Sequence, residues 1–361
     1  MKKRLFACIL ALLMLLPLSA LADEDSENAV YRLVDAQGKT VTFFAGTPAR
    51  GDEYIAGDNT HYRVEEVHET EKTAAVQSLG AYPMPDVSFI QDEARPVSAQ
   101  KKAVALYCTH SDESYEPGDG ASSLEKRGGI FDVAESLKAS LEEKGITVYL
   151  SETNHYPHDA GAYRRSRATA ASLAEEGVDA IFDVHRDGIP DASQYESQVG
   201  GGNVTKVRLL VGRSNQNAAA NKQFAAQIKA TADKLYPGLI KDIYIGKGTY
   251  NQDLMSQAVL LEFGTHKSDK KEVLASTAYM ADVLSRAMYG GSTGAAGSSA
   301  SKNTGGWTGI LWAVGLLIAG VLVYSFLSTG SVSGAAHKWK RQFQEMTAGL
   351  RGRSEKDGRD P

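Results

Sequence analysis

Two histidines and a glutamate stand directly after strongly apolar runs, where they could bind a metal ion. His110 follows AVALYCT, His185 follows AIFDV, and Glu262 follows AVLL, while Glu113 adds a His-x-x-Glu pair to the first of them. Because the carboxyl ends of parallel strands meet at one edge of a sheet, these side chains are expected to converge. Two imidazoles and a carboxylate suit a catalytic Zn²⁺, which takes three protein ligands and leaves a position open for water. The ion lowers the pKa of that water, and a nearby carboxylate can accept its proton.

Each of these residues also has a structural explanation. A lone histidine at a strand end is more often hydrogen-bonded in place than a metal ligand. Glu262 is more informative, because a carboxylate inside VLLEF is costly unless it is paired or functional. Asp183, which also lies in an apolar run, could orient a ligand histidine, although a satisfied core acid is favoured. His155 and His158 are expected on a polar loop, and that loop could line a cleft.

Residues 101–289 alternate between apolar runs and amphipathic stretches, which predicts a three-layer α/β domain with a mainly parallel sheet. The expected strands are 103–108, 146–150, 180–185, 206–211 and 259–263, with a further candidate at 242–245. The expected helices are 130–144, 163–176, 217–235 and 269–288. This part of the chain carries all the candidate site residues, so we expect it to be the catalytic domain.

The residues before position 101 have a different pattern. Residues 23–69 alternate apolar and polar positions around Gly-containing turns, which predicts a small β-rich accessory domain of short antiparallel strands. Residues 70–100 contain three prolines and are expected to form a connecting segment. No chemistry is expected in either region.

Both ends of the chain indicate a membrane. Residues 1–22 match a secretory signal cleaved after Ala22, with an uncleaved anchor as the alternative. Residues 307–327 contain no charged residue and are long enough for a transmembrane helix. The segment 290–306 is predicted to be a Gly/Ser-rich linker, and the basic tail 328–361 favours the cytoplasmic side. We therefore expect a single-pass membrane protein whose catalytic domain lies outside the cytoplasm.

The composition excludes other classes. The 361 residues carry a net charge of −5 and 42% apolar residues, so a dedicated nucleic-acid binder and a disordered chain are both excluded. The two basic ends carry +3 each, which leaves −11 for residues 23–327. Two cysteines cannot form a disulfide scaffold, and only Cys108 remains if the signal is removed.

Four motifs of residues 101–289 occur in the order expected of one family. They are YCTHSDESY, AGAYRRSR, IFDVHRDG and GTYNQDLMSQAVLLEFGTHKSDKKE, and they resemble the stage II sporulation protein P family of endospore-forming bacteria. The resemblance implies a zinc-dependent N-acetylmuramoyl-L-alanine amidase that cuts the amide between glycan and stem peptide in peptidoglycan. It also implies a role in septal wall thinning and engulfment, beside the stage II D lytic transglycosylase and the stage II M membrane protein.

Carried over to this sequence, the resemblance assigns His110 and His185 as zinc ligands and Glu262 as the catalytic carboxylate. The third ligand is Glu113, in THxxExY, or Glu125, in LEKRGG, and Glu113 is preferred. Arg186 could orient a substrate carboxylate or acyl oxygen, and an internal salt bridge to Asp187 is the alternative.

Two features depart from the family pattern. Cys108 stands where relatives commonly have histidine, so a buried strand cysteine is expected, with a soft extra zinc ligand as the alternative. The family is usually described with an N-terminal anchor, whereas a C-terminal span is expected here. Two other functions stay open: a stem-peptide endopeptidase or carboxypeptidase, and a tethered protein that binds peptidoglycan without cutting it.

Overall fold

The computed structural model describes residues 29–88, 90 and 102–290. The predicted signal 1–22, the predicted span 307–327 and the tail 328–361 lie outside the described residues, as does the predicted linker beyond Gly290. No helix within the described ranges is both long and apolar enough to cross a membrane.

One sheet of 11 strands organises the described chain, in the order β2-β1-β5-β4-β3-β12-β11-β13-β8-β6-β7. Its larger part consists of β6 (Ala103–Tyr107), β7 (Thr147–Leu150), β8 (Ala180–Asp187), β11 (Val207–Gly212), β12 (Ile240–Gly246) and β13 (Ala258–Thr265). Within this part only the β11–β13 pair is antiparallel, so the predicted mainly parallel α/β sheet is confirmed. The predicted strand at 242–245 is also present, as part of β12.

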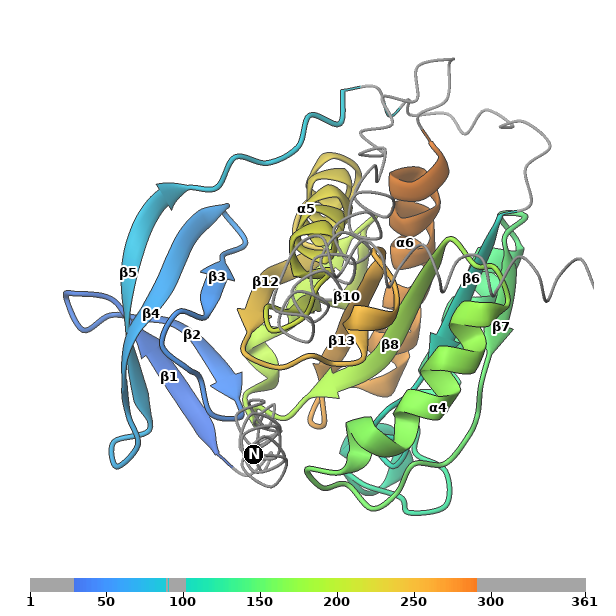
Figure 1. Cartoon of the computed structure of the whole chain (residues 1–361), viewed down its shortest axis with the longest axis horizontal. Helices are drawn as coiled ribbons and strands as arrows, with labels where there is room; N and C mark the ends of the chain where they lie inside the picture. The colour runs from blue at the N-terminus through green and yellow to red at the C-terminus, as the bar shows by residue number, and fades with distance from the viewer. Residues whose placement is uncertain (1–28, 89, 91–101, 291–361) are drawn as a thin grey trace, which may run out of the picture. The chain divides into compact units, whose positions relative to one another are not determined.

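Helices cover both faces of this sheet. They are α2 (Glu116–Asp119), α3 (Ile130–Glu142), α4 (Ala162–Glu175), α5 (Ala218–Leu235) and α6 (Lys270–Tyr289), with short 3₁₀ turns η1 (Ala192–Gln194) and η2 (Gln252–Leu254). Buried apolar side chains of α3, α5 and α6 pack on one face, and α4 packs on the other (Figure 1). Because side chains of a strand alternate between faces, each strand contributes to both layers. The four helices predicted from the sequence are confirmed, with ends shifted by one or two residues.

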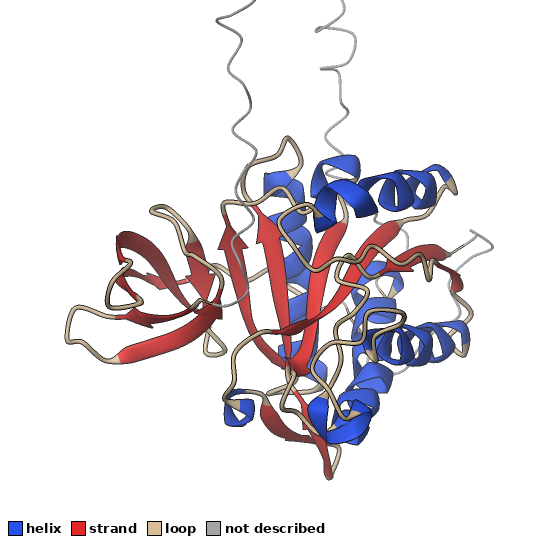
Figure 2. Cartoon of the chain, turned by 90° about the horizontal axis from the view of Figure 1, so that it is seen from below, coloured by secondary structure: helices blue, strands red, loops and turns tan. Residues whose placement is uncertain are grey.

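The N-terminal module, residues 29–81, contains β1 (Val30–Val34), β2 (Thr40–Ala45), β3 (Glu53–Ile55), β4 (Thr60–His68) and β5 (Thr73–Ala81). Strand β3 pairs antiparallel with β12, so the module continues the larger sheet at one end (Figure 2). The predicted short antiparallel strands are present. These strands belong to the same sheet as the strands of residues 101–289. The module is therefore not a separate accessory layer.

Two features were missed by the sequence analysis. Strand β5 lies in the range 70–100, which was predicted to be a connecting segment, and it pairs with both β1 and β4. Apolar and polar residues alternate little along β5, because the side chains of its second half are all exposed. The hairpin of β9 (Glu196–Val199) and β10 (Gly202–Thr205) was also missed, because its strands are short and polar.

A shared hydrophobic cluster joins the module to the larger part. It includes Leu33 and Val64 inside the module and continues through Tyr244 to Leu260 and Tyr163. Phe44 of β2 stacks on Tyr244 of β12 with ring centroids 3.9 Å apart. The module therefore covers part of the sheet face that α4 leaves open.

Candidate active site

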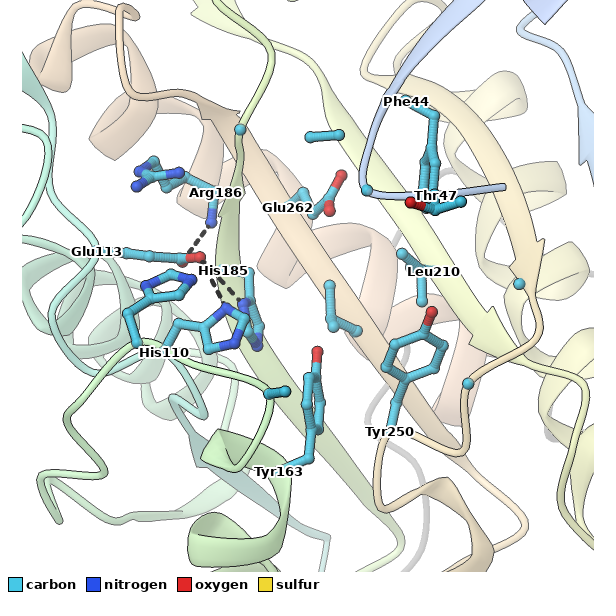
Figure 3. A pocket seen from close by; sticks show the side chains of 18 of the residues that line it. Phe44, Thr47, His110, Glu113, Tyr163, His185, Arg186, Leu210, Tyr250 and Glu262 are labelled. Carbon is cyan, nitrogen blue, oxygen red and sulfur yellow. Dashed lines mark hydrogen bonds and ion pairs between the residues drawn. The ribbon is translucent and has the colours of Figure 1, made fainter. Parts of the chain in front are cut away.

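Three of the predicted ligands lie together in the structure. One potential ligand atom each from His110, Glu113 and His185 falls within 4.8 Å of the others, and the structure brings no other such group together among its described residues. Glu113 Oε1 is 3.3 Å from Nδ1 of both histidines (Figure 3). His110 follows β6 and His185 lies within β8, so neighbouring parallel strands position the pair.

A second carboxylate holds His185 from the other side. Asp183 Oδ1 is 3.0 Å from His185 Nε2, while Thr109 donates to both Asp183 oxygens through its backbone N–H and hydroxyl. This arrangement leaves Nδ1 facing the ligand group and places a carboxylate beside the opposite ring nitrogen, where it can orient a metal-binding histidine. Asp183, expected to be a satisfied core acid, is satisfied and also orients the candidate ligand.

Glu113 is the carboxylate best placed to bind a cation. Its side chain is fully buried, and Oε2 accepts a hydrogen bond of 2.8 Å from the Arg186 backbone N–H. Burial alone would raise the pKa of Glu113, but the His185 and His110 imidazoles outweigh it and lower the pKa to about 2. A carboxylate that stays ionised in a buried site is suited to bind a divalent cation.

Glu125, the alternative ligand, is not part of this group. It is exposed, and its carboxylate accepts a hydrogen bond from the Tyr156 hydroxyl at 3.1 Å. The spacing that suggested Glu125 does not bring its carboxylate to the histidines, because residues 124–127 form an exposed stretch before α3.

Glu262 lies in the row of charged residues that crosses the open face of the sheet. In the strand register Glu262 is paired with His185 on one side and with Arg208 on the other, and Arg208 is paired with Asp242. We call these four residues the charged row. Because residues paired directly across neighbouring strands point to the same face of a sheet, all four side chains share one face.

The surroundings of Glu262 explain its ionisation. Burial and the nearby Asp187 carboxylate raise the pKa of Glu262 to about 8, against the opposing effect of Arg208 and His185. Arg208 Nη1 lies 3.7 Å from Glu262, and the Tyr195 hydroxyl lies 3.3 Å from Glu262 and 2.7 Å from Asp187. A carboxyl group with a pKa near neutrality is suited to accept and return a proton.

Arg186 lines the same cleft, but its guanidinium is directed at the backbone. It donates to the carbonyls of Ser114 and Ser122 at 3.2 Å each. The Asp187 carboxylate, the expected partner of Arg186 in the alternative interpretation, lies 2.8 Å from Arg208. Arg186 therefore supports the loop around Glu113, and its predicted role toward substrate stays a prediction.

The remaining histidines and the cysteine have distinct places. His155 is buried between the Cys108 carbonyl and the Thr169 hydroxyl, at 2.8 and 3.0 Å, so it has a structural role. His158 lines the cleft, where its ring stacks on His110 at 3.8 Å and its Nδ1 lies 3.2 Å from Asp112. Cys108 is buried, as expected, and burial raises the pKa of its thiol well above the ordinary value, which disfavours a zinc-binding thiolate.

The cleft extends from the candidate metal ligands along the sheet to the N-terminal module. Leu210, Leu260 and Glu262 line it from the sheet, and Tyr163 of α4 lies beside His185 (Figure 3). The far wall contains Tyr250 together with Phe44 and Thr47, which belong to the module. The module, for which no chemistry was expected, therefore forms part of the site.

A strained loop positions Tyr250. Tyr250 and Asn251 both have positive φ, 49° and 54°, a conformation that costs energy for residues other than glycine. Two buried amides hold this loop in place. Asn251 donates to the Tyr163 carbonyl at 3.0 Å, and Gln252 donates to the Leu210 carbonyl at 2.9 Å.

One signal for the charged row was present in the sequence. Arg208 interrupts the apolar run VRLLV in the same way that Glu262 interrupts VLLEF, so it could have been flagged by the same reasoning. The sequence contains no comparable signal for Phe44 or Thr47, because these residues line the cleft only through the position of the module.

Comparison with known proteins identifies the family. Residues 44–285 match the family model for Stage II sporulation protein P (SpoIIP). The chain belongs to this family. It is 26% identical over 262 residues to Stage II sporulation protein P of Bacillus subtilis (strain 168), and the match covers 65% of each protein. The chain therefore spans slightly less than two thirds of that relative's length. The matched range begins in β2, so the family includes most of the N-terminal module.

Several solved structures of N-acetylmuramoyl-L-alanine amidases are also similar. The catalytic domain of CwlV from Bacillus (Paenibacillus) polymyxa var. colistinus is 17% identical with a TM-score of 0.35, covering 51% of this chain and 97% of that structure. The CwlD amidase from Clostridioides difficile, in complex with the GerS lipoprotein, is 13% identical with a TM-score of 0.35, covering 52% and 95%.

Proposed function

We propose that this SpoIIP-family protein is a zinc-dependent peptidoglycan hydrolase that cleaves the amide between N-acetylmuramic acid and L-alanine. The observation that carries the proposal is the convergence of His110, Glu113 and His185 beside Glu262 in one cleft. The group offers three ligands, as a catalytic zinc site requires. Zinc bound there would polarise the scissile carbonyl and lower the pKa of a bound water.

The donor set fits zinc on the chemistry of its residues. Two imidazoles and one buried, ionised carboxylate are typical zinc ligands, and Asp183 supplies a carboxylate 3.0 Å from the far ring nitrogen of the ligand His185. Glu125 is left out of the proposed set because it is exposed.

Glu262 has the role of proton acceptor and donor in this proposal. It accepts the proton of the attacking water and returns it to the departing amine of L-alanine. Tyr195 and Arg208 hold the carboxylate at the cleft floor. Since Glu262 and His185 are partners in the strand register, the proton acceptor lies next to the candidate ligand group.

The biological setting is part of the same proposal. Family membership supports action on septal peptidoglycan during engulfment, beside the stage II D transglycosylase and the stage II M membrane protein. The sequence at the two ends supports a membrane location with the catalytic domain outside the cytoplasm.

The test uses the full chain, because the module forms one wall of the cleft. Purified protein incubated with peptidoglycan is expected to release peptides with new L-alanine amino termini, detected by mass spectrometry. A chelator should stop the reaction and Zn²⁺ should restore it. Glu262→Gln should remove activity, while Glu125→Ala serves as the matched carboxylate control. Full activity of Glu262→Gln would refute the mechanism.

The products also separate the alternatives. New termini inside the stem peptide would show an endopeptidase or carboxypeptidase. Binding of peptidoglycan without any new termini, from a protein that holds no zinc, would show a non-catalytic binding protein.

A further inference from the structure

The Tyr250 ring is the aromatic surface that the cleft offers to a ligand. The phenylalanine and tyrosine residues of the cleft lining are Phe44, Tyr163 and Tyr250. Phe44 and Tyr163 are buried, with only 7% and 9% of their surface exposed, whereas Tyr250 is half-buried. A ligand in this cleft therefore meets the Tyr250 ring more than either of the others.

One face of the Tyr250 ring lies on the backbone of Gly248. A β-carbon on Gly248 would lie 2.4 Å from Tyr250 Cζ, and 2.6 and 2.8 Å from the two ε carbons. Three ring carbons at such similar distances place that point above the ring face and not beyond its edge. A β-carbon on Gly212 would lie 3.0 Å from Cδ2 of the same ring. The ring is thus seated on backbone that only glycine leaves open.

The opposite face of the ring is not covered by the neighbouring tyrosine. Tyr163 meets Tyr250 at an angle of 66° with ring centroids 5.3 Å apart, so it does not lie flat on the ring. Figure 3 shows the Tyr250 ring broadside in the cleft, with Tyr163 beside it. The positive φ of Tyr250 and the hydrogen bond from Asn251 to the Tyr163 carbonyl hold the ring in this place at a cost in backbone strain.

The surroundings of this free face suit an uncharged ring better than a peptide strand. The sheet floor beside it consists of Leu210 and Leu260, which are apolar and buried. Backbone groups that could pair with a peptide are covered, since Arg208 donates to the Phe43 carbonyl and the Tyr250 ring lies over Gly248. An aromatic ring in an apolar cleft remains as the recognition group.

The chemistry of peptidoglycan then selects the glycan. The face of an aromatic ring is electrically negative, and it attracts the weakly positive C–H groups on one side of a sugar ring. The glycan is uncharged wherever its lactyl groups are joined to peptide, whereas the stem peptide carries carboxylates that would lie beside apolar side chains here.

We propose that the free face of Tyr250, which we call the ring platform, binds a sugar of the glycan strand by stacking. This inference rests on the proposed function, and it assigns the module end of the cleft to the glycan half of the substrate. The platform would hold the sugar while its lactyl amide reaches the ligand group.

The first experiment compares two ligands in variants of the full chain. One ligand is a tetrasaccharide of alternating N-acetylglucosamine and N-acetylmuramic acid, with its lactyl groups capped as methylamides so that it stays uncharged. The other is a stem tripeptide with an acetylated amino terminus. Tyr250→Ala should weaken tetrasaccharide binding at least fivefold and change peptide binding less than twofold. Tyr250→Phe, which keeps the ring face, should stay within twofold for both ligands. Dissociation constants are measured by calorimetry.

Lys247 provides the matched control, because it also lines the cleft and would attract a peptide carboxylate. Lys247→Met should leave tetrasaccharide binding within twofold of wild type. No binding of the tetrasaccharide by wild type, or a larger loss for the peptide than for the tetrasaccharide in Tyr250→Ala, would overturn the proposal. An equal loss in Tyr250→Phe would overturn it as well, since the hydroxyl and not the ring face would then bind the ligand.

A second variant displaces the ring without removing it. Gly248→Ala puts a β-carbon where the ring now lies, so the ring must move. We expect at least fivefold weaker tetrasaccharide binding. Melting temperatures verify that the variants fold, and Gly248→Ala decides the question if Tyr250→Ala does not fold. Wild-type affinity in folded Gly248→Ala would refute the ring platform.

The outcomes distinguish this inference from the proposed function, because neither ligand contains the bond to L-alanine. Unchanged tetrasaccharide binding by Tyr250→Ala, with release of L-alanine termini from peptidoglycan by wild type, would refute the ring platform and leave the amidase proposal standing. Loss of tetrasaccharide binding in Tyr250→Ala, with no release of L-alanine termini by wild type, would support the ring platform and refute the amidase.

Discussion

The two faces of the central sheet are made by the same strands and have opposite chemistry. Under α3, α5 and α6 the strands present apolar side chains such as Leu209 and Leu261, which are fully buried. At the adjacent position of each strand, on the other face, the side chains are Arg208 and Glu262. The first face gains stability from burial alone, whereas the second contains charges that are stable only in the presence of one another.

The comparison shows how a single sheet combines a stable core with a reactive site. The charged face is enclosed by α4 on one side and by the N-terminal module on the other, with the cleft between them. Arg208 donates to the Phe43 carbonyl and to Asp242, so the module also supplies a partner to the charged row. The enclosure is partial: Glu113 and His185 are buried, and an open cleft lies beside them.

The strongest test of the charged face is removal of a ligand. His185→Ala deletes one of three proposed zinc ligands, so we expect zinc below one tenth of an equivalent and peptidoglycan release at background. Zinc content by mass spectrometry and L-alanine termini are measured together. Full zinc content in this variant would place the metal elsewhere.

The two faces should differ in how their stability depends on pH. Arg208→Met leaves Asp187 without its buried cation and Asp242 with Lys241 alone, and should cost about 3–5 kcal/mol. Leu261→Ala leaves a cavity and should cost about 2–5 kcal/mol. Against the opposing effect of burial, Arg208 and Lys241 lower the pKa of Asp242 to about 2. We therefore expect the loss from Arg208→Met to grow as pH rises and Asp242 ionises, and the loss from Leu261→Ala to stay constant. Denaturant unfolding at several pH values checks this, and parallel profiles would contradict the comparison.

A smaller effect is expected from the carboxylate behind His185. Asp183→Asn keeps the shape of the side chain and weakens its hold on the histidine, so zinc affinity should fall about 10–100-fold. Competition with a coloured chelator measures the affinity. Asp112→Asn is the control, because Asp112 pairs with His158, which is outside the proposed ligand set. Equal losses in both variants would argue against a specific role for Asp183.

Glu262 should make the metal-free protein less stable as pH rises. Its folded pKa of about 8 exceeds the ordinary value of 4.5, so between these pH values the folded state holds a proton that the unfolded state has released. Stability is then lost with increasing pH, by up to about 1.4 kcal/mol per unit. The difference in unfolding free energy between wild type and Glu262→Gln isolates this slope. A constant difference from pH 5 to 8 would refute the raised pKa.

The smallest effect is expected outside the cleft. Glu125→Ala removes an exposed carboxylate bonded to Tyr156, so stability should change by less than about 0.5 kcal/mol and zinc content should be unchanged. Glu113→Ala is the matched comparison and should lose zinc. Loss of zinc in Glu125→Ala would reverse the proposed choice of ligand.

The sequence was sufficient to predict the strands and helices of the larger part and most residues of the candidate site. Apolar runs and helical spacing gave the strands and helices of the larger part to within a few residues, because burial requires those patterns. His110, His185 and Glu262 were identified since polar residues at such positions are costly without a purpose. Weakly patterned elements were missed, among them β5 and the β9–β10 hairpin.

Local sequence therefore determined the family, the α/β pattern and the residues able to bind a metal. The tertiary structure decided which carboxylate joins the histidines, since the sequence preferred Glu113 but left Glu125 open, and only Glu113 is buried beside His185. It also placed the N-terminal module in the wall of the cleft. That placement depends on the pairing of β3 with β12, a contact between residues nearly 200 positions apart, and short-range patterns carry no information about such pairings.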